Sequence, residues 1–281
     1  MTEPERLLAP AKLNLCLFLG ARRADGLHEI CSLFEPLTLA DLIEVSSSEG
    51  VDEVICPGVD GENLAARALA ALRERGWEHP AVELRIEKRI PVAAGLGGGS
   101  ADAAAVLRLG REEVGDLEAI AAGVGADVPS QLLPAMALVS GAGEVVRRLP
   151  DPERHAVVLL PGGGGLSTAE VFAEADRLGL GRSSAELDDL RGRLLETAGA
   201  GASPLTYADS LGNDLEAAAM RLRPEIGDAI SCLRDAGAGF AAMTGSGPTA
   251  FGLFDDLGAA RAAAARIGSA EAIVCEGGAP A

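Results

Sequence analysis

The chain has 281 residues, of which 24 are basic and 42 acidic, so its formal net charge is −18 at pH 7. This acidity excludes nucleic acid and anionic membrane surfaces as expected partners, while a hydrophobic content of 48% excludes a disordered chain. The five cysteines form no CxxC pair and no apolar run is long enough to span a membrane, which predicts a cytoplasmic protein with reduced thiols.

The first half of the chain predicts a mixture of strands and helices. The segment KLNLCLFLG at 12–20 alternates, which predicts a strand with the leucines of odd number on one face and Lys12 with Asn14 on the other. Only two of the 24 basic residues are lysines, so arginine serves wherever a plain positive charge is enough, and a lysine on this strand indicates a specific role. The further elements expected here are a turn at 25–26, strands at 32–39, 41–47, 52–57 and 81–90, helices at 62–76, 101–109, 116–125 (capped by Asp116) and 125–133, and a hairpin of 136–141 with 144–149.

The segment PDPERH at 150–155 is rich in proline and charge, as boundaries between domains are. It predicts two domains, 1–150 and 151–281. Strands and helices mix irregularly along the chain, which favours an α+β fold over a regular β-α alternation. The elements expected in the second half are a strand at 156–161, a helix capped by Ser167 or Thr168, a polar helix from 184, a helix over 213–237 broken at Pro224, a hairpin around 244–249, a helix at 256–267 and a strand at 271–276.

A glycine-rich loop lies in the segment IPVAAGLGGGSADAAAVLRL at 90–109, directly between an expected strand and an expected helix. A helix N-terminus presents unpaired N–H groups, and glycines let the backbone approach an anion closely, so this arrangement favours a phosphate-binding loop. Ser100 and Asp102 are placed to cap the helix or to touch a phosphate or its metal. The loop matches neither the Walker motif nor the GxGxxG fingerprint, and the chain lacks the HRD and DFG signatures of protein kinases. A flexible linker is the alternative.

Three segments together resemble the three motifs of the GHMP kinases: APAKLNLCL at 9–17, PVAAGLGGGSADAAAVL at 91–107 and MTGSGPTAFGLF at 243–254. The segments RADGLH, ENLAARA, GADVP and GND are similar to those of the branch that acts on cytidine diphosphate-linked methylerythritol. The resemblance implies a two-domain α+β GHMP kinase fold, with an N-terminal ribosomal-protein-S5-domain-2-like domain, a C-terminal ferredoxin-like α/β domain and the active site in the cleft between them.

The same resemblance implies the chemistry. ATP and Mg²⁺ would be the cofactors, and the 2-hydroxyl of the methylerythritol unit would be phosphorylated in the non-mevalonate isoprenoid pathway. A monomer or weak homodimer is expected. Two alternatives stay open: a GHMP kinase for another small alcohol, similar to mevalonate or homoserine, and a catalytically silent nucleotide-binding relative.

The resemblance implies that Asp127 and Lys12 are the catalytic residues. Asp127 would orient the substrate hydroxyl or accept its proton, and a nearby helix N-terminus favours its ionised form. Lys12 would hold that carboxylate charged and stabilise charge on the transferring group. The alternatives are a helix-capping Asp and a surface Lys at a strand edge. Lys88, His79 and His155 are expected to be exposed to solvent.

On the nucleotide side, the resemblance implies that the loop cradles the phosphates, with Ser100 near Mg²⁺. The expected nucleotide-binding residues are Asn63, Pro91, Ala94, Gly95, Leu96, Gly97, Gly98, Gly99, Ser100 and Ala101. The segment TGSGPT at 244–249 would shape the substrate side and brace the glycine loop; a plain hairpin turn is its alternative.

On the substrate side, the resemblance implies that His28 recognises the cytosine edge and that Phe172 stacks on the base. A histidine in a surface loop and a phenylalanine in a helix core are the alternatives. Leu27 stands where the family has Tyr, and because stacking is worth about 1–3 kcal/mol per base, cytidine specificity is in question. The remaining residues expected to bind substrate are Asn14, Thr168, Gly245 and Ser246.

Overall fold

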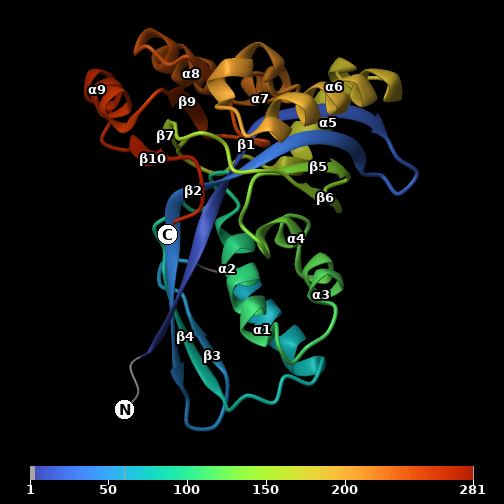
Figure 1. The fold of residues 1–281 in the computed structure, drawn as a ribbon, viewed down its shortest axis with the longest axis vertical. Coiled ribbons are helices and arrows are strands. Elements are labelled where there is room, and N and C mark those ends of the chain that lie inside the picture. Colours follow the sequence, from blue (N-terminus) through green and yellow to red (C-terminus); the bar gives the residue numbers. More distant parts are fainter. Residues whose placement is uncertain (1–3, 60, 281) are drawn as a thin grey trace.

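The computed structural model describes residues 4–59 and 61–280, and two β-sheets carry the fold (Figure 1). The first sheet has the order β3-β4-β2-β5-β6, and β1 pairs with β2 outside that path. The second has the order β10-β7-β9-β8. The strands are β1 Glu5–Arg22, β2 His28–Ser47, β3 Glu53–Ile55, β4 Val82–Glu87, β5 Ala137–Gly141, β6 Val145–Arg148, β7 Ala156–Leu160, β8 Phe240–Met243, β9 Ala250–Phe254 and β10 Ile273–Glu276.

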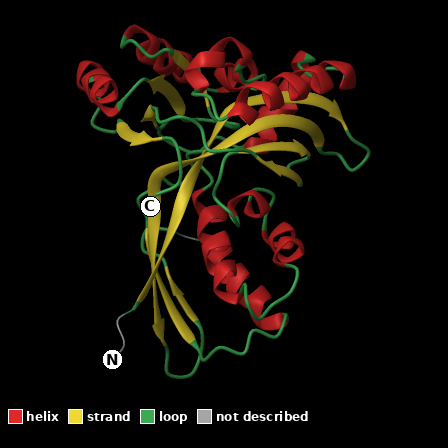
Figure 2. Cartoon of the chain, viewed as in Figure 1, coloured by secondary structure: helices red, strands yellow, loops and turns green. Residues whose placement is uncertain are grey.

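The helices form two groups, one beside the lower strands of the first sheet and one at the top of the view, over the second sheet and the upper part of the first (Figure 2). The first group is α1 Leu64–Glu74, α2 Gly98–Leu107, α3 Leu117–Val124 and α4 Val128–Gln131. The second group is α5 Thr168–Leu178, α6 Ser184–Thr197, α7 Glu216–Leu222, α8 Glu225–Asp235 and α9 Leu257–Ile267. Short 3₁₀ turns lie at Arg108–Gly110, Ala198–Ala200 and Pro204–Ser210. None of the helices formed by these described residues is long and apolar enough to cross a membrane.

The second sheet has the ferredoxin-like topology that the family resemblance implies. Its strands lie in the order fourth, first, third, second along the chain, all neighbours are antiparallel, and helices follow its first and third strands. The segment between Arg148 and Ala156 separates the strands of the two sheets. The domain limits at 150 and 151 stay a prediction, because one apolar core draws side chains from both sides of that segment.

β1 and β2 form a long antiparallel ribbon that runs through both halves of the molecule (Figure 1). A register shift between Asn14 and Cys16 marks a β-bulge, and a bulge changes the face to which the following side chains point. Leu15 accordingly packs in the same cluster as Cys16, whereas Leu17 packs in another. The expectation that the leucines of odd number share one face was therefore wrong. β2 is also one continuous strand where two strands were expected.

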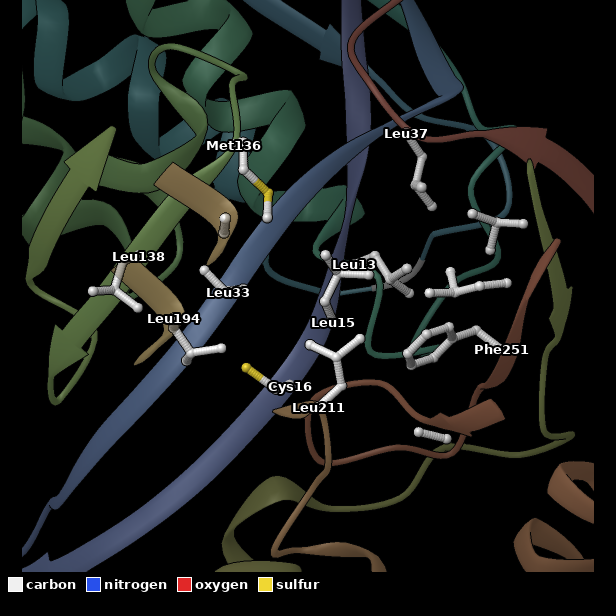
Figure 3. Packing of buried hydrophobic residues seen from close by; sticks show 14 of the residues in the cluster. Leu13, Leu15, Cys16, Leu33, Leu37, Met136, Leu138, Leu194, Leu211 and Phe251 are labelled. Carbon is white, nitrogen blue, oxygen red and sulfur yellow. The ribbon is translucent and has the colours of Figure 1, made fainter. Parts of the chain in front are cut away.

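The central core lies where this ribbon passes between the two groups of elements (Figure 3). Leu13 and Leu33 come from the ribbon, Leu138 from β5, and Phe251 from β9. Buried apolar surface on both sides of the ribbon holds β1 in place, at about 25 cal/mol for each Å² removed from water. Lys12 and Asn14 therefore project from a strand that the apolar clusters on its two faces anchor.

Candidate active site

Two cavities meet at the glycine loop. A cavity of about 340 Å³ is lined by residues 91–100 of the loop together with Asn63 and other side chains. A second cavity, of about 720 Å³, is lined by Lys12, Asp127 and other side chains. Gly95 and Gly97 line both cavities, so the glycine loop is their shared wall. We call them the nucleotide cavity and the substrate cavity.

Glycine is required at the two shared positions because the loop packs tightly there. Gly95 has φ +77°, and a Cβ on it would lie 2.7 Å from the backbone oxygen of Gly247. Gly97 has φ +71° and is the N-cap of α2; a Cβ on it would lie 2.8 Å from Cγ of Lys12. Within the part of the chain that the structure describes, no side chain caps α2, so its first N–H groups can meet an anion where Gly98 lines the nucleotide cavity.

Neighbouring segments hold the loop in this shape. The backbone N–H of Lys12 donates to the oxygen of Leu96 over 2.9 Å, which attaches the loop to β1. The hydroxyl of Thr249 donates to the oxygen of Ala94 over 2.7 Å. The segment at 244–249 does form the turn between β8 and β9, and its contact with Ala94 is the kind of bracing that the sequence predicted.

Lys12 and Asp127 lie side by side in the substrate cavity. The ammonium Nζ is 3.3 Å from Oδ2 of Asp127 and donates to Oδ1 of Asn14 over 2.6 Å. It also lies 4.6 Å from the centre of the Phe34 ring. The Lys12 side chain is only 8% exposed, which rules out a surface lysine, while Asp127 is 35% exposed. Asp127 occupies the N-cap position of α4, yet its side chain makes no capping hydrogen bond, so capping alone does not explain it.

His28 and Phe172 face each other at another part of the substrate cavity. Their ring centres are 5.2 Å apart and the rings are tilted by 41°. Nε2 of His28 lies 2.7 Å from Oδ1 of Asp176, and the His28 side chain is buried, so it is not a surface-loop histidine. Phe172 packs on the apolar core and also lines the cavity. Leu27 is 55% exposed at the rim.

The other predicted residues take the following places. Asn14, Thr168, Gly245 and Ser246 all line the substrate cavity, and the hydroxyls of Thr168 and Ser246 are 2.8 Å apart. Ala101 differs from the other predicted nucleotide residues, because it is buried in the core behind the loop. Those that line the nucleotide cavity are Asn63, Pro91, Ala94, Gly95, Leu96, Gly97, Gly98, Gly99 and Ser100.

The expectation of a solvent-exposed Lys88 was wrong. Its ammonium lies between Asp41 and Asp102, 2.7 Å from Oδ2 of Asp102, and the side chain is 13% exposed. Burial opposes the charge on Lys88, but the two carboxylates outweigh it and raise the pKa of Lys88. Burial raises the pKa of Asp102 to about 7, against the attraction of Lys88. Asp41 also accepts from the backbone N–H of Ile90 over 2.8 Å, so this cluster anchors the entrance to the glycine loop.

The expectation for His155 was wrong as well, whereas His79 is exposed as predicted. His155 is buried, and its Nε2 lies 3.2 Å from Oε2 of the buried Glu35. Burial works against protonation, but the hydrogen bond and the charge of Glu35 raise the pKa of His155. This pair joins the segment before β7 to β2, and neither of its two residues is among those that line the cavities.

Comparisons with known proteins agree with this architecture. The family model for the GHMP kinases N terminal domain matches residues 63–133, and the model for GHMP kinases C terminal matches residues 205–273. The chain is 41% identical over 272 residues to the 4-diphosphocytidyl-2-C-methyl-D-erythritol kinase of Anaeromyxobacter sp. (strain K), covering 92% of this chain and 84% of that one. It is 40% identical to the kinase of the same name from Nocardia farcinica, covering 95% and 90%.

Solved structures give the same result. A crystal structure of a 4-(cytidine 5'-diphospho)-2C-methyl-D-erythritol kinase superposes with a TM-score of 0.82 at 34% identity, over 98% of this chain and 99% of that one. A homoserine kinase from Cytophaga hutchinsonii superposes with a TM-score of 0.71 at 18% identity, over 98% and 94% of the two chains, which shows the shared fold alone.

Proposed function

The chain belongs to the 4-diphosphocytidyl-2-C-methyl-D-erythritol kinases, a family of GHMP kinases, and from that premise we propose that it phosphorylates the 2-hydroxyl of this substrate with ATP. The reaction would serve the non-mevalonate isoprenoid pathway. The observation that carries the proposal is the meeting of two cavities at Gly95 and Gly97, beside Lys12 and Asp127. Phosphoryl transfer needs a donor and an acceptor held on opposite sides of the moving group, and two cavities that share Gly95 and Gly97 support such an arrangement.

Asp127 would orient the 2-hydroxyl and take its proton, and Lys12 would stabilise the negative charge of the transferring phosphoryl group. A weak base suffices because the transition state of phosphoryl transfer is loose and requires little proton removal early. Lys12 is buried and held by Asn14 and Phe34, so its charge acts from a fixed position. The stem of Lys12 passes close to Gly97, where an added Cβ would lie 2.8 Å from Cγ of Lys12. A compact ammonium also differs from the planar fork of an arginine in this role.

GHMP kinases use ATP, and the nucleotide cavity would hold its phosphates against the loop and the N-terminus of α2. The described residues contain no cluster of three or more His, Cys, Asp or Glu side chains that could hold a metal by itself. Mg²⁺ in kinases is held largely by phosphate oxygens with one or two protein groups, so the Ser100 hydroxyl and the nearby Asp102 fit that requirement. When bound, Mg²⁺ would neutralise charge on the phosphates.

The cytosine would lie near His28 and Phe172, and the methylerythritol unit would lie near Asn14 and Asp127. Thr168 and Ser246 would complete the substrate side. Leu27 at the rim offers apolar contact in place of a second aromatic ring. We further propose a cytoplasmic monomer or weak homodimer with the domain limits at 150 and 151, and no nucleic-acid partner, since the net charge of −18 repels polyanions.

A panel assay tests the proposal. ATP is supplied with 4-diphosphocytidyl-2-C-methyl-D-erythritol, mevalonate, homoserine or galactose, and the new phosphate ester is followed by ³¹P NMR. We expect turnover of the cytidine-linked alcohol alone. Preferred turnover of mevalonate or homoserine would favour the alternative kinases, and ATP binding without turnover of any alcohol would favour a silent relative.

Asp127→Asn tests the catalytic assignment. Because Asp127 is 35% exposed and forms no capping hydrogen bond, the variant should fold normally. Its kcat should fall by about 10²–10⁴-fold, the usual contribution of a positioned general base. A near-normal kcat in the folded variant would remove Asp127 from the mechanism.

A further inference from the structure

His28 has a fixed acidic partner inside the substrate cavity. Its Nε2 lies 2.7 Å from Oδ1 of Asp176 in α5. Phe172 precedes Asp176 by four residues on the same helix, so both side chains project from one helical face. All three residues line the cavity. The helix therefore presents to His28 an aromatic ring and a carboxylate one turn apart.

The carboxylate decides which ring nitrogen of His28 carries the proton. An ionised carboxylate only accepts hydrogen bonds, so a contact of 2.7 Å with Nε2 requires a proton on Nε2. In the neutral imidazole, Nδ1 is then an acceptor with a free lone pair. Among residues 4–59 and 61–280, no protein group forms a hydrogen bond with Nδ1 of His28, this atom is not among the fully buried ones that lack a partner, and His28 lines the cavity.

An acceptor at this place distinguishes pyrimidine bases. Cytosine carries a 4-amino group, which donates, whereas a uracil-type base carries a carbonyl oxygen there, which accepts. Nδ1 of His28 can receive a hydrogen bond from the amino group. Opposite the carbonyl, two acceptors would face each other, and each would be left without a partner in a largely buried place.

We infer that Asp176 is a positioning residue that makes His28 a hydrogen-bond acceptor and so selects cytidine-linked over uridine-linked substrate. The inference rests on the proposed function and deepens it, since it assigns base selection to a pair in which Asp176 acts through His28. The other charged groups that line the cavity are Lys12, Arg22 and Asp127. Lys12 and Asp127 are paired with each other, so they do not replace Asp176 as the partner of His28.

The first test measures the tautomer directly. The chain has three histidines, so ¹⁵N-detected imidazole spectra are simple, and His28→Gln identifies the His28 signals. At about pH 8.5, where an ordinary imidazole is neutral, the wild type should show the proton on Nε2 of His28. A wild-type His28 with its proton on Nδ1 would overturn the inference whatever the enzyme's activity.

The second test compares kcat/KM for the cytidine-linked substrate with kcat/KM for its uridine-linked analogue. Asp176→Asn keeps the shape but can present either a donor or an acceptor to Nε2, so the cytidine preference should fall at least tenfold, mainly through KM. Asp176→Glu keeps an acceptor-only group and should retain most of the preference. Glu170→Gln removes one negative charge from the first turn of α5 without touching His28, and should leave the ratio unchanged.

The outcomes separate this inference from the proposed function. An unchanged ratio in a folded Asp176→Asn variant, with a cytidine preference in the wild type, would refute the role of Asp176 alone. Absence of cytidine-linked turnover in the wild type would refute the proposed function, and the tautomer spectra would then decide the inference by themselves.

Discussion

Gly95→Ala tests the claim that the wall between the two cavities is held in one conformation. Gly95 has φ +77°, a left-handed backbone that costs alanine about 1–2 kcal/mol. The added Cβ would lie 2.7 Å from the oxygen of Gly247, which belongs to backbone and cannot swing aside. Overpacking of this kind costs about 1–3 kcal/mol, so we expect the free energy of unfolding to fall by about 2–5 kcal/mol.

The measurement is urea unfolding of the wild type and two variants, together with the KM for ATP. Gly99→Ala is the matched control for stability: its Cβ would lie 3.6 Å from Cδ1 of Leu64, an ordinary contact, and its φ is not left-handed. Because Gly99 lies within α2, alanine there should stabilise by up to about 1 kcal/mol. If Gly95→Ala unfolded at the wild-type urea concentration and kept the wild-type KM for ATP, the loop would not be held as described.

Two further predictions concern buried charges. Lys88→Met leaves Asp41 and Asp102 without their cation and should lower the free energy of unfolding at pH 8 by about 3–5 kcal/mol in urea melts, while Asp102→Asn in the same chain should restore part of it. His155 has a raised pKa, so its pairing with Glu35 stabilises fully below about pH 6.5 and is lost as pH rises through the raised folded-state value. The urea midpoint of the wild type should therefore drop more from pH 6 to 9 than that of His155→Gln; equal slopes would contradict this pairing.

Features that depend on a few adjacent residues could be predicted from the sequence. Asp116 caps α3 and Ser167 caps α5 as expected, because a capping side chain acts within three residues of itself. The break at Pro224 separates α7 from α8, since proline cannot continue the helical hydrogen bonding. The glycine loop at the start of α2 could be predicted in the same way, from its glycines and the expected strand and helix on either side.

Features that depend on distant partners could not be predicted. Lys88 stands on an alternating strand and looks exposed until β2 brings Asp41, 47 residues earlier, against it. His155 meets Glu35 across 120 residues. The bulge between Asn14 and Cys16 cannot be recognised in the alternation of hydrophobic residues, yet it changes the face of the sheet to which the following side chains point. The placement of Lys12 beside Asp127 came from resemblance to a family, because spacing alone gives no contact across more than a hundred residues.

The β1–β2 ribbon also has a consequence for how the protein is made. The apolar side chains of the ribbon are synthesised early, whereas Leu211 and Phe251, against which they pack, are synthesised late. The backbone N–H of Gly278, near the end of the chain, donates to the oxygen of Pro36 in β2. At about 5–20 residues per second, synthesis from Ser47 to Gly278 takes on the order of 10–50 s. Throughout that interval the apolar face of the β1–β2 ribbon lacks the C-terminal side chains that cover it in the folded protein, so the ribbon stays open to non-specific association until synthesis is nearly complete.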